Sequence, residues 1–235
     1  MKNLIIFGIF ILALVLVQFA QAQTVDDVIN NHIKAIGGKE NLQKITNVIL
    51  EGSLSVQGAE IEVTITQVNN KLSRQDINAM GMTGFAFMTE KEGWTYMPFQ
   101  GMQKPEPKTE DEVKESQSDL DVNGPLVDYT AKGHKVELVG KEDVEGTECY
   151  KIKVKLAGGK EQAFYIDPAS NMIVRIKETR KFNGKEVEMT TDYSDYKEVE
   201  GVKMPFSISQ QYGTILISGI KVNQAIPESL YKHDL

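Results

Sequence analysis

The residue types that most often carry chemistry are few and scattered in this sequence. The chain has three histidines and one cysteine, His32, His134, His233 and Cys149, and none of them belongs to a metal-binding or redox motif. We interpret each histidine as a solvated or capping side chain. Cys149 is interpreted as a small residue covered by a neighbouring strand, with an intermolecular disulfide as the alternative.

Two pairs of aspartates have the spacing of paired catalytic carboxylates, but local structure explains both. Asp26 and Asp27 lie in the first turn of an expected helix, where acidic side chains are favourable. Asp192 and Asp195 lie in a polar turn. The sequence also lacks zinc-protease, Cys-x-x-Cys, serine-hydrolase and phosphate-loop motifs. We therefore expect that the protein is not an enzyme and that it binds no cofactor or metal. The alternative is an active site formed by carboxylates that are distant in the sequence.

One stretch, residues 78–102, is rich in adaptable apolar side chains. Five of the nine methionines lie there among aromatic residues. Methionine suits surfaces that accept variable apolar shapes, so the stretch is either core or the lining of a cavity. The candidate ligand-binding residues from it are Met80, Met82, Phe85, Phe87, Met88, Trp94 and Tyr96. Because neighbours in a strand alternate sides, only about half of these can face one cavity.

Export is indicated by residues 1–22. Lys2, the apolar run Leu4–Val17 and an Ala-x-Ala motif ending at Ala22 have the layout of a secretory signal peptide, and a membrane anchor is the alternative. We expect one mature domain, residues 23–235, located in the periplasm or secreted, and monomeric. The net charge of −7 gives no electrostatic footprint for nucleic acid.

Helical periodicity opens the mature domain, and an alternation of period two follows it. Thr24 is the expected N-cap of a helix that ends at Gly37 and Gly38. From Val48 onward apolar and polar residues alternate, which is typical of antiparallel strands with one buried face. We predict a mainly β fold with some α: a strongly curved antiparallel sheet, an open half-barrel of about ten or eleven strands, covered by helices. The apolar stripe expected to pack the opening helix on the concave side includes Val28, Ile29, Ile33 and Ile36.

An insert at residues 103–126 interrupts the strands. It begins with a proline-rich linker, and Thr109 and Glu112 then form a capping box for a helix that runs to about Leu120. This helix is highly charged, and Val113 and Leu120 are its main apolar residues. Little burial would hold it in place, so we expect a movable flap.

Several stretches resemble the superfamily of periplasmic lipoprotein carriers and, more closely, its outer-membrane lipoprotein-sorting relatives. Residues 33–48 are similar to the opening helix and its Gly-Gly-Lys-Glu stop, and the strand at Arg74 is similar to one that ends in an inward arginine. Gly93, Trp94 and Tyr96 are similar to a family hairpin, although the spacing to the tryptophan is shorter here. The strand–turn–strand pattern of the sorting relatives is followed by residues 136–154, 164–178 and 196–208.

The resemblance implies an open β-barrel whose apolar concave face is covered by helices. It implies a non-catalytic carrier of an apolar group, such as a lipoprotein acyl chain or a lipid, with envelope proteins as further partners. Arg74 would then be a ligand-site residue that latches the lid, and simple pairing with Asp76 is the alternative. Because a fold does not prove a function, a cell-envelope interaction module with a self-filled core and no ligand is the second hypothesis.

Overall fold

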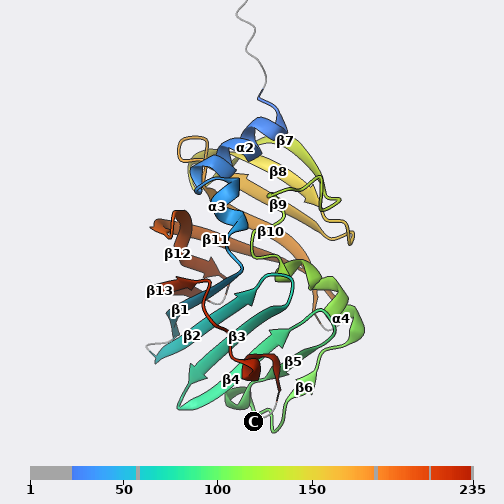
Figure 1. Ribbon diagram of the computed structural model, residues 1–235, viewed down its shortest axis with the longest axis vertical. Helices are drawn as coiled ribbons and strands as arrows, with labels where there is room; N and C mark the ends of the chain where they lie inside the picture. Colours follow the sequence, from blue (N-terminus) through green and yellow to red (C-terminus); the bar gives the residue numbers. More distant parts are fainter. Residues whose placement is uncertain (1–22, 57–58, 183–184, 212, 234–235) are drawn as a thin grey trace, which may run out of the picture.

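The computed structural model describes residues 23–56, 59–182, 185–211 and 213–233, and the expected signal peptide lies outside these ranges. One antiparallel sheet forms the body of the protein, with helices against it (Figure 1). The strands are β1 Asn47–Val56, β2 Ala59–Val68, β3 Leu72–Ala79, β4 Met82–Met88, β5 Gly93–Tyr96, β6 Glu106–Pro107, β7 Lys135–Val144, β8 Thr147–Lys155, β9 Glu161–Ile166, β10 Ile173–Phe182, β11 Lys185–Val199, β12 Val202–Gln210 and β13 Gly213–Val222. The helices are α2 Val25–Ala35, α3 Lys39–Gln43 and α4 Glu110–Glu115, with 3-10 turns η1 Pro98–Gln100, η2 Gln117–Leu120 and η3 Glu228–Tyr231.

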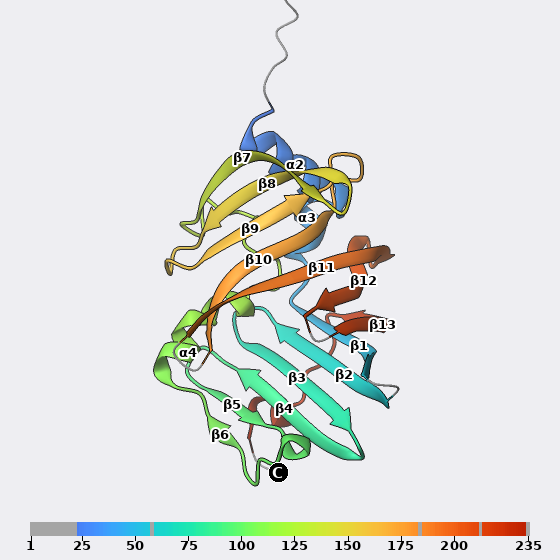
Figure 2. The same ribbon diagram turned by 180° about the vertical axis from the view of Figure 1, so that it is seen from behind.

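The sheet consists of two meanders joined in the middle. Strands β1 to β6 and β7 to β13 each pair in sequence order, and β1 pairs with β13, so that β6 and β7 are the two edges. The sheet is strongly twisted and does not close, which confirms the expected open, curved antiparallel architecture (Figures 1 and 2). It has thirteen strands in the described part of the chain, more than the ten or eleven expected.

One strand that the sequence did not indicate is β6, in the proline-rich start of the insert. Its Pro107 lies opposite Trp94 of β5, and its Glu106 lies opposite Thr95. Proline is tolerated at this position because β6 is an edge strand, where a missing N–H removes no bond to an outer neighbour. The linker is therefore attached to the sheet and does not run free of it.

Helices α2 and α3 pack on one face of the sheet, which we call the helix-covered face. Thr24 and Asp27 form a capping box at the start of α2. Val28 and Ile29 are buried against strands β8 and β9, and Ile33 and Ile36 contact the clusters on this face, as expected. This packing orients the opening helix.

His32 lies in the same helix and is not solvated, contrary to the expectation. Its side chain is 5% exposed, and Nδ1–H donates a hydrogen bond to the carbonyl oxygen of Asn171 over 2.8 Å. Burial lowers the pKa of the imidazole, and the hydrogen bond to Asn171 opposes that effect only in part. The histidine is thus a neutral core residue that ties α2 to the β9–β10 turn.

The insert crosses between the two halves of the sheet. The capping box of Thr109 and Glu112 is present, and Val113 and Leu120 are buried. The expected single helix is divided into α4 and the 3-10 turn η2. No helix in the described ranges is long and apolar enough to span a membrane.

Ion pairs attach the insert to strand β10. Asp119 of η2 lies 3.0 Å from Arg180 Nη1, and Arg180 also pairs with Glu178. Burial acts to raise the pKa of Glu178, but the charges of Arg180 and Lys160, with hydrogen bonds from Lys160 and Gln162, bring this pKa down to about 2. The charged insert is therefore anchored by paired charges as well as by apolar contacts, and its mobility stays a prediction.

Cys149 is fully buried, and it packs with Val144 and Tyr165 on the face of the sheet opposite the helices. Burial raises the pKa of its thiol. A buried, protonated thiol is poorly placed for an intermolecular disulfide. The interpretation of Cys149 as a covered structural residue is therefore supported.

Candidate functional site

Five of the eight candidate ligand-binding residues come together on strands β3, β4 and β5. The strand register places Arg74 opposite Phe87 and Asp76 opposite Phe85. It also places Phe85 opposite Tyr96, and Phe87 opposite Trp94. Paired residues share a face of a sheet. We call this surface the aromatic platform, and it consists of Leu72, Arg74, Phe85, Phe87, Trp94 and Tyr96.

The platform faces away from helices α2 and α3. Leu50 packs in the cluster around Leu42 of α3, and Leu50 lies opposite Ile65 in the sheet. Arg74 lies opposite Thr66, the next residue along β2, which must point to the other side. These residues therefore lie on the face of the sheet opposite helices α2 and α3.

The C-terminal segment, residues 224–233, covers the platform. Leu230 and Tyr231 join the apolar cluster of Leu72, Phe85 and Phe87. His233 stacks on Trp94, with the ring centroids 3.7 Å apart and the planes 7° apart. Figure 1 shows this segment in dark red, crossing in front of β2 and β3 and ending beside β4.

Arg74 holds the C-terminal segment in place. Its Nη1 donates to the carbonyl oxygens of Leu230 and Lys232, each over 3.2 Å, and its Nε donates to Asp76 over 2.9 Å. The guanidinium carbon lies 4.6 Å from the centroid of the Phe85 ring, and Arg74 is 9% exposed. Both the latch and the Asp76 pairing are therefore present, but the latch holds the chain end, and neither the insert nor the opening helix.

The three candidate methionines lie elsewhere. Met88 is buried, and its register with Ser73 places it on the helix-covered face. Met82 lies on the same face at the end of β4 and is 38% exposed. Met80 lies in the β3–β4 turn with a φ of 55° and is 86% exposed. Their role in binding stays a prediction.

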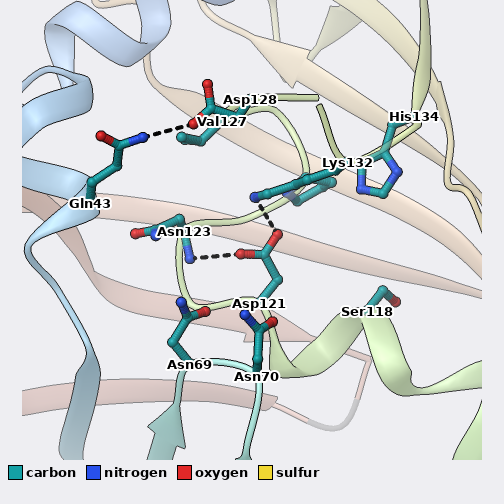
Figure 3. Close-up of a pocket in the computed structure, with 11 residues that line it drawn as sticks. Gln43, Asn69, Asn70, Ser118, Asp121, Asn123, Val127, Asp128, Lys132 and His134 are labelled. Carbon is teal, nitrogen blue, oxygen red and sulfur yellow. Dashed lines mark hydrogen bonds and ion pairs between the residues drawn. The ribbon is translucent and has the colours of Figure 1, made fainter. Parts of the chain in front are cut away.

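A second candidate site is a cavity of about 320 Å³ on the helix-covered face (Figure 3). Three segments far apart in sequence meet around it: α3, the β2–β3 turn, and the chain from η2 to β7. None of the eight candidate residues lines it. The lining residues are Gln43, Asn69, Asn70, Ser118, Asp121, Asn123, Pro125, Val127, Asp128, Lys132 and His134.

Charges in the cavity wall are paired within the protein. Lys132 Nζ lies 2.6 Å from Asp121 and donates to the carbonyl oxygen of Gly124 over 2.8 Å. Asp128 pairs with Lys39 and accepts a hydrogen bond from Gln43 over 2.8 Å. These partners, Lys39 above all, lower the pKa of Asp128 and keep it ionised.

His134 contributes a neutral donor to this wall. Its Nδ1 accepts the backbone N–H of Ala157 over 3.1 Å, so the proton of the neutral ring lies on Nε2. Burial, followed by the nearby charge of Lys132, lowers the pKa of the ring. Sequence reasoning missed this cavity because its residues come from separate turns, although the Asn69-Asn70 and Asn123-Gly124 pairs mark two of those turns.

No protein family and no curated protein matches the sequence, whereas solved structures share its fold. A DUF1329 family protein from Desulfovibrio piger is 13% identical with a TM-score of 0.55, over 90% of this chain and 98% of that one. A putative outer membrane lipoprotein-sorting protein domain from Vibrio parahaemolyticus is 10% identical with a TM-score of 0.52, over 87% and 94%. The LolA superfamily protein NE2245 from Nitrosomonas europaea is 13% identical with a TM-score of 0.53, over 90% and 98%. The chain therefore has a LolA-like fold.

Proposed function

We propose that this protein is a non-catalytic periplasmic binder or carrier of an apolar group, such as a lipid or a lipoprotein acyl chain. One observation carries the proposal: within the described residues, an aromatic platform on a LolA-like sheet is covered by a short chain end. The cargo would replace the C-terminal segment on the platform. Its signal peptide, residues 1–22, would be removed, and residues 23–235 would act as a single monomeric domain.

The contacts of the C-terminal segment make displacement feasible. Only Leu230 and Tyr231 join the apolar cluster of the platform, and much of the remaining segment is exposed to solvent. An acyl chain gains about 0.8 kcal/mol for each methylene it buries. Ten methylenes would therefore supply roughly 8 kcal/mol before ordering costs, enough to compete with two apolar side chains and a latch.

A second candidate is an envelope interaction module that binds no apolar ligand. It is favoured by the fact that Leu230 and Tyr231 already fill the platform, as a self-filled core would require. In this case the C-terminal segment would be a permanent part of the fold. The two functions differ in whether the C-terminal segment leaves the aromatic platform.

Binding of a long-chain fluorescent fatty acid separates the two candidates. Trp94 is the only tryptophan, so its emission reports on the platform alone. We expect the mature protein to bind the probe at micromolar concentration with a change in Trp94 emission. Leu230→Gln should bind more tightly, because a polar side chain weakens the cover.

The matched control is Leu216→Gln, at a leucine that is 60% exposed and lies on β13 outside the platform. Its affinity for the probe should equal that of the wild type. Absence of binding by both the wild type and Leu230→Gln would favour the interaction module. Binding without any change in Trp94 emission would place the apolar site elsewhere.

A further inference from the structure

We propose that the cavity between α3, the β2–β3 turn and the insert binds a small neutral polyhydroxylated molecule of the size of a monosaccharide. The inference does not depend on the proposed apolar cargo, since the aromatic platform lies on the opposite face of the sheet. It rests on polar groups without partners, on a wall whose charges are already neutralised, and on the volume of the cavity.

Several polar side chains of the wall have unused hydrogen-bonding capacity. The hydroxyl of Ser118 is buried and has no hydrogen-bond partner within the described residues. The carboxamides of Asn70 and Asn123 likewise make no hydrogen bond to any described residue, and Figure 3 shows the Asn70 side chain directed toward Asp121. The buried Ser118 hydroxyl is costly unless water or a ligand satisfies it, whereas Asn70 is exposed and Asn123 is partly buried, so their carboxamides are open to a ligand.

The remaining polar groups are held in fixed orientations. Asn69 accepts the backbone N–H of Val122 through Oδ1 over 3.2 Å, which leaves its amide N–H₂ for a ligand. His134 presents its Nε2–H, because Nδ1 is occupied by Ala157. Donors and acceptors thus lie on different sides of one cavity, which suits hydroxyl groups because each hydroxyl both donates and accepts.

The charge pairing argues against an ionic ligand. Asp121 is neutralised by Lys132, and Asp128 by Lys39, so neither sign is in excess in the wall. An anion or cation would lose its hydration without gaining an unpaired counter-charge. A neutral polyol loses only hydrogen bonds with water, which the free amide, hydroxyl and imidazole groups replace.

The size of the cavity fits the same class. Its volume of about 320 Å³ is at the lower end of the range for small-molecule sites. Pro125 and Val127 add apolar surface for the C–H groups of a sugar ring. A molecule bound here would contact η2, α3 and the β2–β3 turn together, so it would hold the insert against the sheet.

Nuclear magnetic resonance titration of the mature protein tests the proposal. The probes are D-glucose, D-galactose, N-acetyl-D-glucosamine and glycerol, with sulfate and acetate as charged comparisons. We expect at least one sugar to shift the side-chain amide signals of Asn70 and Asn123 with a millimolar Kd. Sulfate and acetate should leave these signals unchanged.

Two variants locate the binding. Asn123→Ala removes one carboxamide, and Asn70→Gly removes another while keeping the φ of 56° that glycine adopts without strain. Each should weaken sugar binding by roughly three- to tenfold, as the loss of one hydrogen bond predicts. Asn78→Ala, at an exposed residue of β3 bonded to Glu62, is the matched control and should bind as the wild type does.

Three results would overturn the proposal. The first is that none of the four neutral probes shifts the cavity signals. The second is that sulfate or acetate shifts them instead. The third is that sugar binding persists unchanged in both Asn70→Gly and Asn123→Ala. Since Asn70→Gly preserves the turn, this variant keeps the test decisive even where Asn123→Ala fails to fold. Fatty-acid binding is measured separately, so the carrier proposal can fail while this one holds.

Discussion

Trp94 and His233 stack face to face, with their ring centroids 3.7 Å apart. The contact joins strand β5, which neighbours the edge strand β6, to the end of the described chain. The indole Nε1–H also donates to Glu92 over 2.9 Å, so the ring is held by the β4–β5 hairpin. His233, in contrast, belongs to the C-terminal segment that covers the platform. Trp94 therefore reports whether the cover is in place.

His233→Ala should make Trp94 more accessible to solvent, because one face of the indole loses its covering ring. We expect red-shifted emission and stronger quenching by acrylamide. His134→Ala, at a histidine far from Trp94 in the polar cavity, should leave both unchanged. Equal quenching of His233→Ala and the wild type would mean that the stacking does not persist in solution.

Arg74→Leu should release the C-terminal segment. The substitution removes two charge-assisted hydrogen bonds to the carbonyls of Leu230 and Lys232, each worth about 1.5–3 kcal/mol. Hydrogen exchange of residues 224–233 should accelerate, while exchange of residues 103–126 should not. Arg74→Lys keeps the positive charge but lacks the planar guanidinium group that donates several hydrogen bonds at once. Its exchange rate for residues 224–233 should therefore lie between those of the wild type and Arg74→Leu. Acceleration confined to the insert would contradict the assignment of the latch.

Asp119→Asn should loosen the insert. Arg180 and Lys160 would lose the carboxylate that links η2 to strand β10 and to the β8–β9 turn, so fewer charged contacts would oppose opening. Residues 103–126 should exchange faster than in the wild type. Asp111→Asn is the matched control, since Asp111 is an exposed residue of α4 in the same insert. If both variants exchange alike, the ion pairs do not hold the insert.

His32 should make the protein less stable in mild acid. Its pKa in the folded state is lowered by burial, so the unfolded chain, with an ordinary pKa of about 6.5, binds the proton more readily. Its contribution is therefore complete above about pH 6.5 and is lost as the pH falls below that value. Urea unfolding at about pH 7.5 and about pH 5.5 measures the effect.

The control for this pH dependence is His32→Asn, which keeps a donor for the Asn171 carbonyl and cannot titrate. The loss of unfolding free energy between the two pH values should be smaller in this variant. An identical loss in the variant and the wild type would assign the pH dependence to other groups.

Gly37→Ala should destabilise the protein more than Gly38→Ala. Both glycines have positive φ, 122° and 83°, so each substitution carries backbone strain of about 1–2 kcal/mol. A Cβ on Gly37 would also lie 2.3 Å from the carbonyl oxygen of Gly201, whereas one on Gly38 would meet nothing within 4 Å. Thermal unfolding of the two variants gives the comparison. Equal losses of stability would show that the turn shifts to accommodate the Cβ of Gly37→Ala at no free-energy cost.

The sequence predicted the helices and strands of this fold better than it predicted which of them pack against one another. Alternation around Leu50 and Ile65 indicated the strands, and Thr24 and Thr109 correctly marked two helix starts. The same alternation shows that Arg74 and Phe87 share a face only once their strands are aligned, and it does not show which face the helices cover. That choice depends on contacts between α3 and distant strands.

The sequence also did not predict that the C-terminal segment covers the platform. Leu230, Tyr231 and His233 form no long periodic pattern, and η3 is only four residues long. Their position depends on the hydrogen bonds of Arg74, which lies more than 150 residues earlier in the chain. The polar cavity was missed for the same reason, because long-range packing brings its turns together.

The pairing of β1 with β13 also determines when the sheet can be completed. Glu51 and Lys221, which pair across this join, are 170 residues apart, so the central contact of the sheet has a very high contact order. A nascent chain must keep the free edge of β1 unpaired until residues 213–222 of β13 have been synthesised. The outer edges, β6 and β7, come instead from the middle of the chain. A break between them would leave both meanders whole, so the molecule is suited to reassembly from two fragments along the β1–β13 seam.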